Sequence, residues 1–509
     1  SATFAPDGLG MHTNAAAALL GITSVRFDPQ LVAQAANAVL NDDPASWNAI
    51  AGDPTRDPGP LVATMTTPVF AMSAWDDFWF PTEKLVEILN TLPASTPRCV
   101  YLGTGGHSSP ANDVERDQRN VWRRDWFDRW LKGVAGSTDA LPNFTYAVTP
   151  SDVNVYLDEL STWEHGGSAV WPPVDTLAYR LYVADNGELW PFAPSGLETS
   201  QTLTQQVAPG FGAQQLLDTE FRWAQVEPNV PLAALTWDSR PLTAPLRFVG
   251  DPIAHLALRP LALQWQVTVS VWDVDELGLA RYITSGSHFG AESAPSVFVN
   301  PVSVHLGSNA YEFPAGHKIR MRLQNVHVHE PATGTLLRYA PTLADFSVEI
   351  SHEVGDESWL ELPLSESLTV PYGWVLPNSQ GCSPALDATG LASTTSTAPF
   401  AIEARNVLNN TDGLLIYSLE RHKKSMGFGQ YLFVRSPVKR CGGLFSGGNA
   451  GPQVDCSGVF EYDFNARIQA GVDSALIPGT RVFAQIWSRD PAAPATTNLT
   501  NAIEFSVFP

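Results

Sequence analysis

Two short segments of the chain carry side chains that could act together in acid–base chemistry. Asp76 and Asp77 follow an apolar run that ends at Ala74, and His107 follows a second run that ends near Gly103. In a Ser-His-acid triad the carboxylate orients an imidazole, which takes the proton of the nucleophile. In α/β-hydrolases the acid precedes the histidine along the chain, and this order holds here. The sequence therefore predicts the acid and the base of a serine hydrolase.

The elements around these segments are expected to alternate between strand and helix. Thr67–Ala74 and Pro97–Leu102 are predicted as strands buried on both faces of a parallel sheet, because they are short and almost continuously apolar. A helix is expected to begin at Pro81, and a longer one to cover about Val114–Leu131, where apolar residues recur at helical spacing. Loops at the carboxyl ends of neighbouring parallel strands share one crevice, so the aspartates and the histidine would meet there.

The rest of the chain has the pattern of β structure. Short alternating runs separated by turns predict a β-sandwich or jelly roll over 151–372. The polar, low-complexity segment 373–400 is expected to be a linker, and 401–509 to form a C-terminal β-rich module. The expected fold class is therefore α/β plus all-β, with an α/β domain over 1–150 whose cap helices occupy about 1–60.

The chain resembles the X-prolyl dipeptidyl-peptidase and cocaine-esterase family of serine hydrolases from roughly residue 60 to 365. The resemblance depends on the order of several motifs. These are Ser73-Ala-Trp-Asp-Asp-Phe78, Leu102-Gly-Thr-Gly-Gly-His107, Trp126-Phe-Asp-Arg-Trp-Leu-Lys-Gly133, Val170-Trp-Pro-Pro173, Arg240-Pro-Leu-Thr-Ala-Pro-Leu246, Val249-Gly-Asp-Pro252 and Ala315-Gly-His-Lys-Ile-Arg-Met-Arg-Leu323. The family pattern of Trp, any residue, Asp implies Asp77 as the acid, with His107 as the base. It also implies a galactose-binding-like jelly roll over 151–372 and no cofactor.

The family's nucleophile is not found in this sequence. The family places a serine between a strand and a helix upstream of these motifs, and no Gly-x-Ser-x-Gly occurs in the chain. We therefore expect residues 1–150 to be the C-terminal part of an α/β-hydrolase domain. A separate N-terminal chain, cut from the same precursor, is expected to supply the serine and the first strands. The expected substrate is a small molecule or peptide with an ester or amide bond, and a β-lactam amide is among the options.

Other interpretations of these residues stay open. Asp76 and Asp77 could be charges at a helix N-terminus, and His107 an ordinary loop histidine. His327 and His329 share one strand face and could bind zinc or copper, but no third ligand at a defined spacing accompanies them, so no metal site is predicted. A function of another class is a non-catalytic extracellular structural or binding protein on a hydrolase-derived scaffold. The sequence leaves oligomerisation open.

Ser1 permits one more enzyme class. A chain that begins with serine can be an N-terminal-nucleophile hydrolase, in which the free amine acts as the base. The segment that follows Ser1 lacks the strand that such a fold places first.

Charge and cysteine content narrow the remaining classes. Lys plus Arg is 30 and Asp plus Glu is 52, which gives a formal net charge of −22. This balance predicts no nucleic-acid partner and no anionic membrane partner.

Cys441 and Cys456 bracket a loop of Gly, Ser, Asn and Pro and are predicted to form a disulfide, whereas Cys382 has no evident partner. A disulfide would favour a secreted, periplasmic or extracellular bacterial protein.

Overall fold

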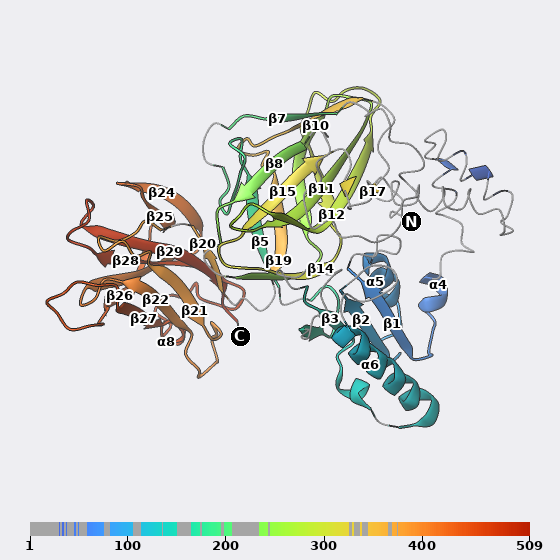
Figure 1. The fold of residues 1–509 in the computed structure, drawn as a ribbon, viewed down its shortest axis with the longest axis horizontal. Helices are drawn as coiled ribbons and strands as arrows, with labels where there is room; N and C mark the ends of the chain where they lie inside the picture. Colours follow the sequence, from blue (N-terminus) through green and yellow to red (C-terminus); the bar gives the residue numbers. More distant parts are fainter. Residues whose placement is uncertain are drawn as a thin grey trace. The chain divides into compact units, whose positions relative to one another are not determined.

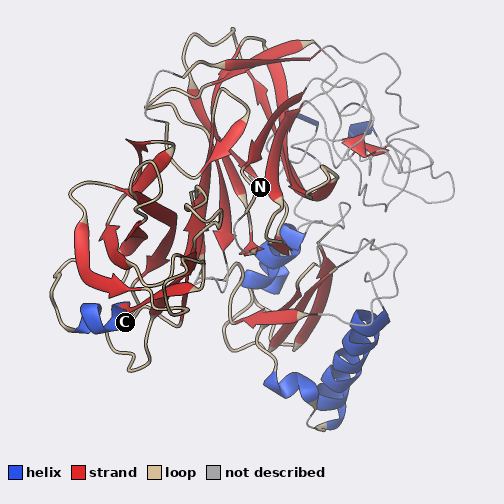
Figure 2. Cartoon of the chain, turned by 60° about the vertical axis from the view of Figure 1, so that its left-hand side comes forward, coloured by secondary structure: helices blue, strands red, loops and turns tan. Residues whose placement is uncertain are grey.

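The chain folds into two compact units in the computed structural model (Figure 1). The N-terminal unit contains Ser1–Pro241 and Arg247–Leu364, and the C-terminal unit contains Leu242–Leu246 and Ser365–Pro509. Strands dominate both units (Figure 2). Apart from a few residues elsewhere, the structure describes 59–75, 82–104, 113–134, 136–149, 164–173, 176–194, 198–205, 234–242, 245–324, 345–364, 369–373 and 375–508. Most of the expected cap region, about 1–60, therefore lies outside the described residues.

A four-stranded sheet forms the α/β part of the N-terminal unit. Its order is β1 (Val69–Ala74), β2 (Arg98–Gly103), β3 (Phe144–Ala147) and β4 (His165–Ser168). The first three strands are parallel, and β4 is antiparallel to β3. The two strands predicted from the sequence are confirmed: β1 begins two residues later than predicted and ends at the predicted Ala74, and both ends of β2 are shifted by one residue.

Helices connect the parallel strands. α4 (Gly59–Val62) precedes β1, α5 (Thr82–Asn90) joins β1 to β2, and α6 (Asp113–Lys132) with the short 3₁₀ helix η2 (Ser137–Ala140) joins β2 to β3. No helix in the described part of the chain is long and apolar enough to cross a membrane.

Alternating side chains of β2 face two separate cores. Val100 and Leu102 pack with Val86 and Leu89 of α5 in one cluster. Tyr101, on the opposite face, packs with Trp122 of α6, and their ring centroids are 5.6 Å apart. The sheet therefore lies between α5 on one face and α6 on the other, as expected for a strand buried on both sides.

A 13-stranded sheet in which nearly all neighbours are antiparallel makes up most of the other described residues of the N-terminal unit. Its strands are β5 (Leu177–Val183), β6 (Glu188–Trp190), β7 (Gln201–Gln205), β8 (Ala234–Ser239), β9 (Leu246–Gly250), β10 (Ile253–Pro260), β11 (Gln264–Val274), β12 (Ala280–Ala291), β13 (Asn300–His305), β14 (Asn309–Phe313), β15 (Lys318–Gln324), β18 (Phe346–Ile350) and β19 (Trp359–Leu364). A separate pair consists of β16 (Val328–His329) and β17 (Leu336–Leu337). Buried and half-buried residues alternate along β18 and β19, so one face of each strand packs into the core.

The C-terminal unit is also built from strands. Its elements are β20 (Thr369–Tyr372), β21 (Ala385–Thr389), β22 (Ala401–Val407), β23 (Asp412–Ser418), β24 (Arg421–Gly427), β25 (Gln430–Val434), β26 (Lys439–Phe445), β27 (Gly458–Asp463), α8 (Phe464–Gln469), β28 (Arg481–Arg489) and β29 (Thr497–Ser506). They form sheets of five (β20-β29-β28-β23-β26), three (β21-β22-β27) and two strands (β24-β25). Phe400, Phe460, Phe464 and Phe505 are fully buried in the core of this unit.

The segment 373–400, expected to be a linker, contributes to the C-terminal unit. Strand β21 lies within it and pairs antiparallel with β22, with Leu386 opposite Ala404. Leu386 and Phe400 are both buried in the core of the unit. The polar composition of this segment concealed a short edge strand, because a few buried apolar residues are enough to fix it.

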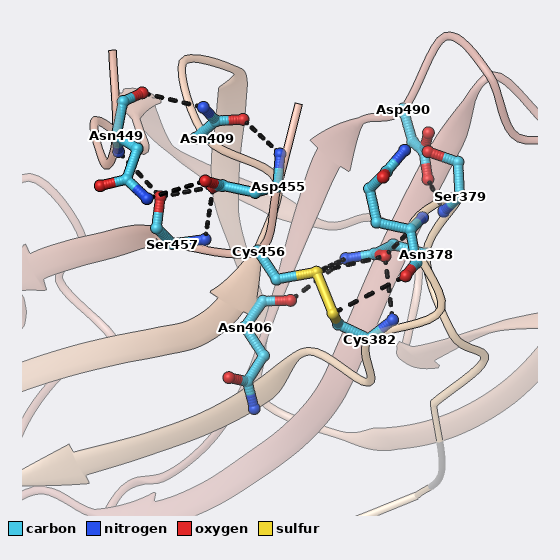
Figure 3. The surroundings of a disulfide bond; sticks show 11 residues. Asn378, Ser379, Cys382, Asn406, Asn409, Asn449, Asp455, Cys456, Ser457 and Asp490 are labelled. Carbon is cyan, nitrogen blue, oxygen red and sulfur yellow. Dashed lines mark hydrogen bonds between the residues drawn. A yellow bond between two sulfur atoms is a disulfide. The ribbon is translucent and has the colours of Figure 1, made fainter. Parts of the chain in front are cut away.

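The predicted disulfide Cys441–Cys456 is wrong. Cys456 is bonded to Cys382, with the two Cα atoms 6.4 Å apart (Figure 3). Cys441 is a free thiol that lies in the apolar core of the C-terminal unit. Burial raises the pKa of this thiol to about 11. The side chain of Cys441 points into the core from β26, so it cannot reach the loop that holds Cys456.

Candidate active site

The parallel strands β1 and β2 end side by side. Ala74 is opposite Gly103, and the backbone N–H of Trp75 donates to the carbonyl of Gly103 at 2.9 Å. The segments that follow these residues therefore start at the same edge of the sheet, as the sequence predicted. Asp76, Asp77 and His107 themselves lie outside the described residues, and their roles stay predictions.

Trp75 fixes the chain directly before the two aspartates. Its side chain is buried, and its indole Nε1 donates to the carbonyl of Ala147 at 3.0 Å. Its ring stacks on Trp171, with centroids 5.5 Å apart. The carbonyl of Trp171 in turn accepts a hydrogen bond from Asn90 at the end of α5, at 3.1 Å. The start of the aspartate loop is therefore held by a packed aromatic pair that joins β1, β3 and α5.

The other end of the aspartate loop is tied to the same strand. The hydroxyl of Thr82, the first residue of α5, donates to the carbonyl of Ala74 at 3.1 Å and lies 2.9 Å from the hydroxyl of Ser73. Thr82 is buried, so these contacts are shielded from water. Trp75 and Thr82, the described residues on either side of 76–81, are thus both placed at the end of β1.

A buried carboxylate joins the two ends of the histidine segment. Glu115, in the first turn of α6, accepts hydrogen bonds from the backbone N–H of Thr104 at 3.0 Å and from the hydroxyl of Tyr101 at 2.7 Å. The hydroxyl of Thr104 also donates to this carboxylate. Glu115 is inaccessible to solvent, and burial raises the pKa of its carboxyl group despite these donors. Burial also lowers the pKa of the neighbouring Arg119.

Gly103 gives the Glu115 carboxylate room to approach β2. A Cβ atom at this position would lie 2.4 Å from Glu115 Oε1 and 2.8 Å from Tyr101 Cε1. Such distances are too short for any side chain, so glycine is required here by a close approach. Glu115 could not be predicted from the sequence, because a glutamate in the first helical turn is ordinarily a solvent-exposed partner of the helix dipole.

A different Asp–His contact lies in the 13-stranded sheet. Asp273 at the end of β11 is buried, and it accepts a hydrogen bond from Tyr311 at 2.6 Å and lies 2.9 Å from His317 Nδ1. Burial raises the pKa of Asp273, which these two partners oppose. The contact joins β11 and β14 to the turn before β15, which makes it a structural link. The described residues contain no group of three or more His, Cys, Asp or Glu side chains that could hold a metal ion.

Among known proteins, only solved structures are similar to this chain. No protein-family model and no curated protein matches the chain. The similar structures include an aminopeptidase from the marine sediment archaeon Thaumarchaeota archaeon (17% identity, TM-score 0.48, 67% of this chain and 65% of that one). They also include a CocE/NonD family hydrolase from Staphylococcus aureus (13% identity, TM-score 0.47, 66% of this chain and 63% of that one). A third is an α-amino acid ester hydrolase (16% identity, TM-score 0.48, 65% of this chain and 62% of that one).

These structural neighbours are hydrolases. The matched part of this chain spans less than two thirds of the length of each of them. No activity follows from likeness at this level.

Proposed function

We propose that this chain supplies the acid and the base of a secreted serine hydrolase that cleaves an ester, amide or peptide bond. The observation that carries the proposal is the register of β1 and β2, in which Ala74 is opposite Gly103. Both loops that hold the proposed groups begin at this point of the sheet. Asp77 orients His107, and His107 takes the proton of the attacking serine and then protonates the leaving group.

The lengths of the two loops support a meeting of these side chains. Asp77 is two residues beyond Trp75, and His107 is three residues beyond Thr104. An extended chain spans at most about 3.6 Å per residue, so Asp77 is within about 7 Å of Trp75 and His107 within about 11 Å of Thr104. Trp75 donates its backbone hydrogen bond to Gly103, the residue directly before Thr104, so the two starting points are adjacent. The carboxylate and the imidazole are therefore within reach of each other.

The proposed partner is an N-terminal hydrolase chain that carries the nucleophilic serine and its oxyanion donors. Within the described part of the chain, β1 pairs only with β2. Only one of the six residues of β1 is buried, whereas five of the six residues of β2 are buried. An apolar edge strand of this kind is normally covered or paired. We place the docking edge of the partner at β1.

The proposed compartment is outside the cytoplasm. The Cys382–Cys456 disulfide supports this proposal, because structural disulfides persist in oxidising environments.

Labelling with a fluorophosphonate probe tests the proposed function. We expect the protein expressed from its complete gene to be labelled on a serine outside residues 1–509. His107→Ala and Asp77→Ala should lose the label and should lower kcat for a p-nitrophenyl ester by about 10³-fold or more. His422→Ala, in the C-terminal unit, is the matched control and should keep full labelling.

Wild-type labelling in His107→Ala would refute the assignment of the base. A wild-type protein that takes no label and turns over no ester would favour the non-catalytic alternative.

A further inference from the structure

A strongly basic segment lies in this acidic protein. Residues 421–440 contain six of the chain's 30 lysines and arginines and no aspartate or glutamate, although the whole chain carries a net charge of −22. The segment forms the hairpin β24–β25 and the start of β26. Figure 1 shows this hairpin as a separate two-stranded element beside the larger sheets of the C-terminal unit. Salt screens charges beyond about 8–10 Å, so a partner close to the hairpin experiences its local positive charge.

Part of this charge is neutralised within the unit. Arg421 pairs with the fully buried carboxylate of Glu504, Arg435 pairs with Glu420, and Lys439 pairs with Asp473. Lys423 lies over the ring of Tyr431, 5.6 Å from its centroid, and Lys424 is exposed. Lys424 is therefore the exposed cation next to the tip, and the half-buried Lys423 adds a second positive charge beside it.

Apolar side chains occupy the tip of the same hairpin. Met426 is 54% exposed and Phe428 is 70% exposed. Phe428 has a φ of 52°, between Gly427 at 87° and Gly429 at 79°. A bulky residue in the left-handed region is disfavoured, and exposing its ring to water is a second cost. Glycine or asparagine would suit this turn better, so the phenylalanine points to a role outside the stability of the folded chain.

The hairpin is held firmly by the body of the C-terminal unit. Phe433 of β25 is fully buried, and its backbone N–H donates to Gln485 Oε1 on β28 at 2.9 Å. The amide of Gln485 donates back to the carbonyl of Tyr431 at 3.1 Å. The hydroxyl of Tyr372 donates to the carbonyl of Phe433 at 3.0 Å. The tip is therefore presented on an anchored strand pair.

We propose that the β24–β25 hairpin docks the protein on an anionic lipid bilayer. The net charge of −22 predicts no such partner, but the proposal depends on the local charge of the hairpin. Met426 and Phe428 enter the boundary between headgroups and acyl chains, while Lys423 and Lys424 face the anionic headgroups. Charge complementarity selects an anionic partner, and the exposed apolar tip selects a bilayer over a soluble polyanion, which offers nothing apolar to receive it. This surface concerns the C-terminal unit alone and does not depend on the proposed hydrolase activity.

Co-sedimentation of the full chain with lipid vesicles tests the proposal. We expect binding to vesicles of phosphatidylcholine with about one third phosphatidylglycerol to be at least about tenfold tighter than binding to phosphatidylcholine alone, and to weaken with added salt. Lys423→Gln combined with Lys424→Gln should weaken this binding by about tenfold or more. Phe428→Asn keeps a residue that tolerates the left-handed turn, removes the apolar group and should weaken binding by about fivefold or more.

Matched controls come from exposed residues of the same unit. Ile477→Ser removes an apolar side chain that is 58% exposed, and Arg405→Gln removes an exposed cation; both should bind as the wild type does. Equal binding to neutral and anionic vesicles would overturn the proposal. So would unchanged binding of Phe428→Asn, or capture by polyphosphate without capture by vesicles, which would indicate a soluble polyanion as the partner. Circular dichroism of each variant confirms that a loss of binding is not a loss of fold.

Discussion

At the scale of single residues, Glu115 shows how burial and hydrogen bonding compete. Its carboxylate receives donors from Thr104 and Tyr101, yet the loss of hydration dominates and raises its pKa. The folded state therefore binds a proton at Glu115 more tightly than the unfolded chain does. The resulting stability is complete below the ordinary carboxyl pKa and is lost as the pH rises through the raised pKa.

Glu115→Gln should change both the stability of this region and its pH dependence. Glutamine replaces one carboxyl oxygen with an NH₂ group that can only donate, whereas the hydroxyl of a protonated carboxyl group can also accept, so we expect the end of β2 to lose about 1–2 kcal/mol at low pH, where Glu115 is protonated. This deficit should shrink as the pH rises, because only the wild type pays the cost of burying a charge. Hydrogen exchange of the Arg98–Gly103 amides, followed between about pH 5 and pH 8, measures the difference.

Asp273→Asn is the matched control for this experiment. Asp273 is also a buried carboxylate with a tyrosine hydroxyl donor and a raised pKa, but it lies on β11. Its substitution should leave exchange in β2 unchanged. A deficit in Glu115→Gln that grows with pH would contradict the stated cause.

At the scale of elements, the close contact between β2 and α6 depends on a glycine. A Cβ at Gly103 would overlap Glu115 Oε1 and the ring of Tyr101. Gly103→Ala should therefore push α6 away from the strand and destabilise the α/β part by about 1–3 kcal/mol. Gly443→Ala, where no heavy atom lies within 4 Å of the added methyl group, is the control and should change little. Limited proteolysis and hydrogen exchange of α6 compare the two variants.

The elements around the candidate site could largely be predicted, because their signals are local. The apolar runs of β1 and β2 and the tryptophan spacing of α6 are sequence patterns, and the structure confirms these elements. The contacts that anchor the two loops could not be predicted in this way. Thr82 and Glu115 act through carbonyl and hydroxyl partners brought together only by the fold. Strand β21 escaped prediction because its segment is polar and its pairing with β22 is a tertiary contact.

At the scale of the whole molecule, one covalent bond connects distant parts of the C-terminal unit. Cys382 and Cys456 are 74 residues apart in sequence, so their bond closes a large loop that includes β21 to β26. In the chain-entropy account, a loop of this size restricts the unfolded state enough to stabilise the folded state by about 4 kcal/mol. The sequence favoured Cys441 instead because it lies closer to Cys456 along the chain, although the fold directs its side chain into the core.

Removing this bond should therefore destabilise the C-terminal unit specifically. Cys382→Ser should lower the free energy of unfolding of this unit by about 2–4 kcal/mol, measured by denaturant unfolding of the full chain with hydrogen exchange as the local probe. Cys441→Ala, which removes only a buried thiol, should cost less and should leave the wild-type bond in place. Iodoacetamide applied to the denatured, unreduced wild type should modify Cys99 and Cys441 and spare Cys382 and Cys456. Modification of Cys382 in that experiment, or equal stability losses in the two variants, would contradict the pairing and its role in the unit.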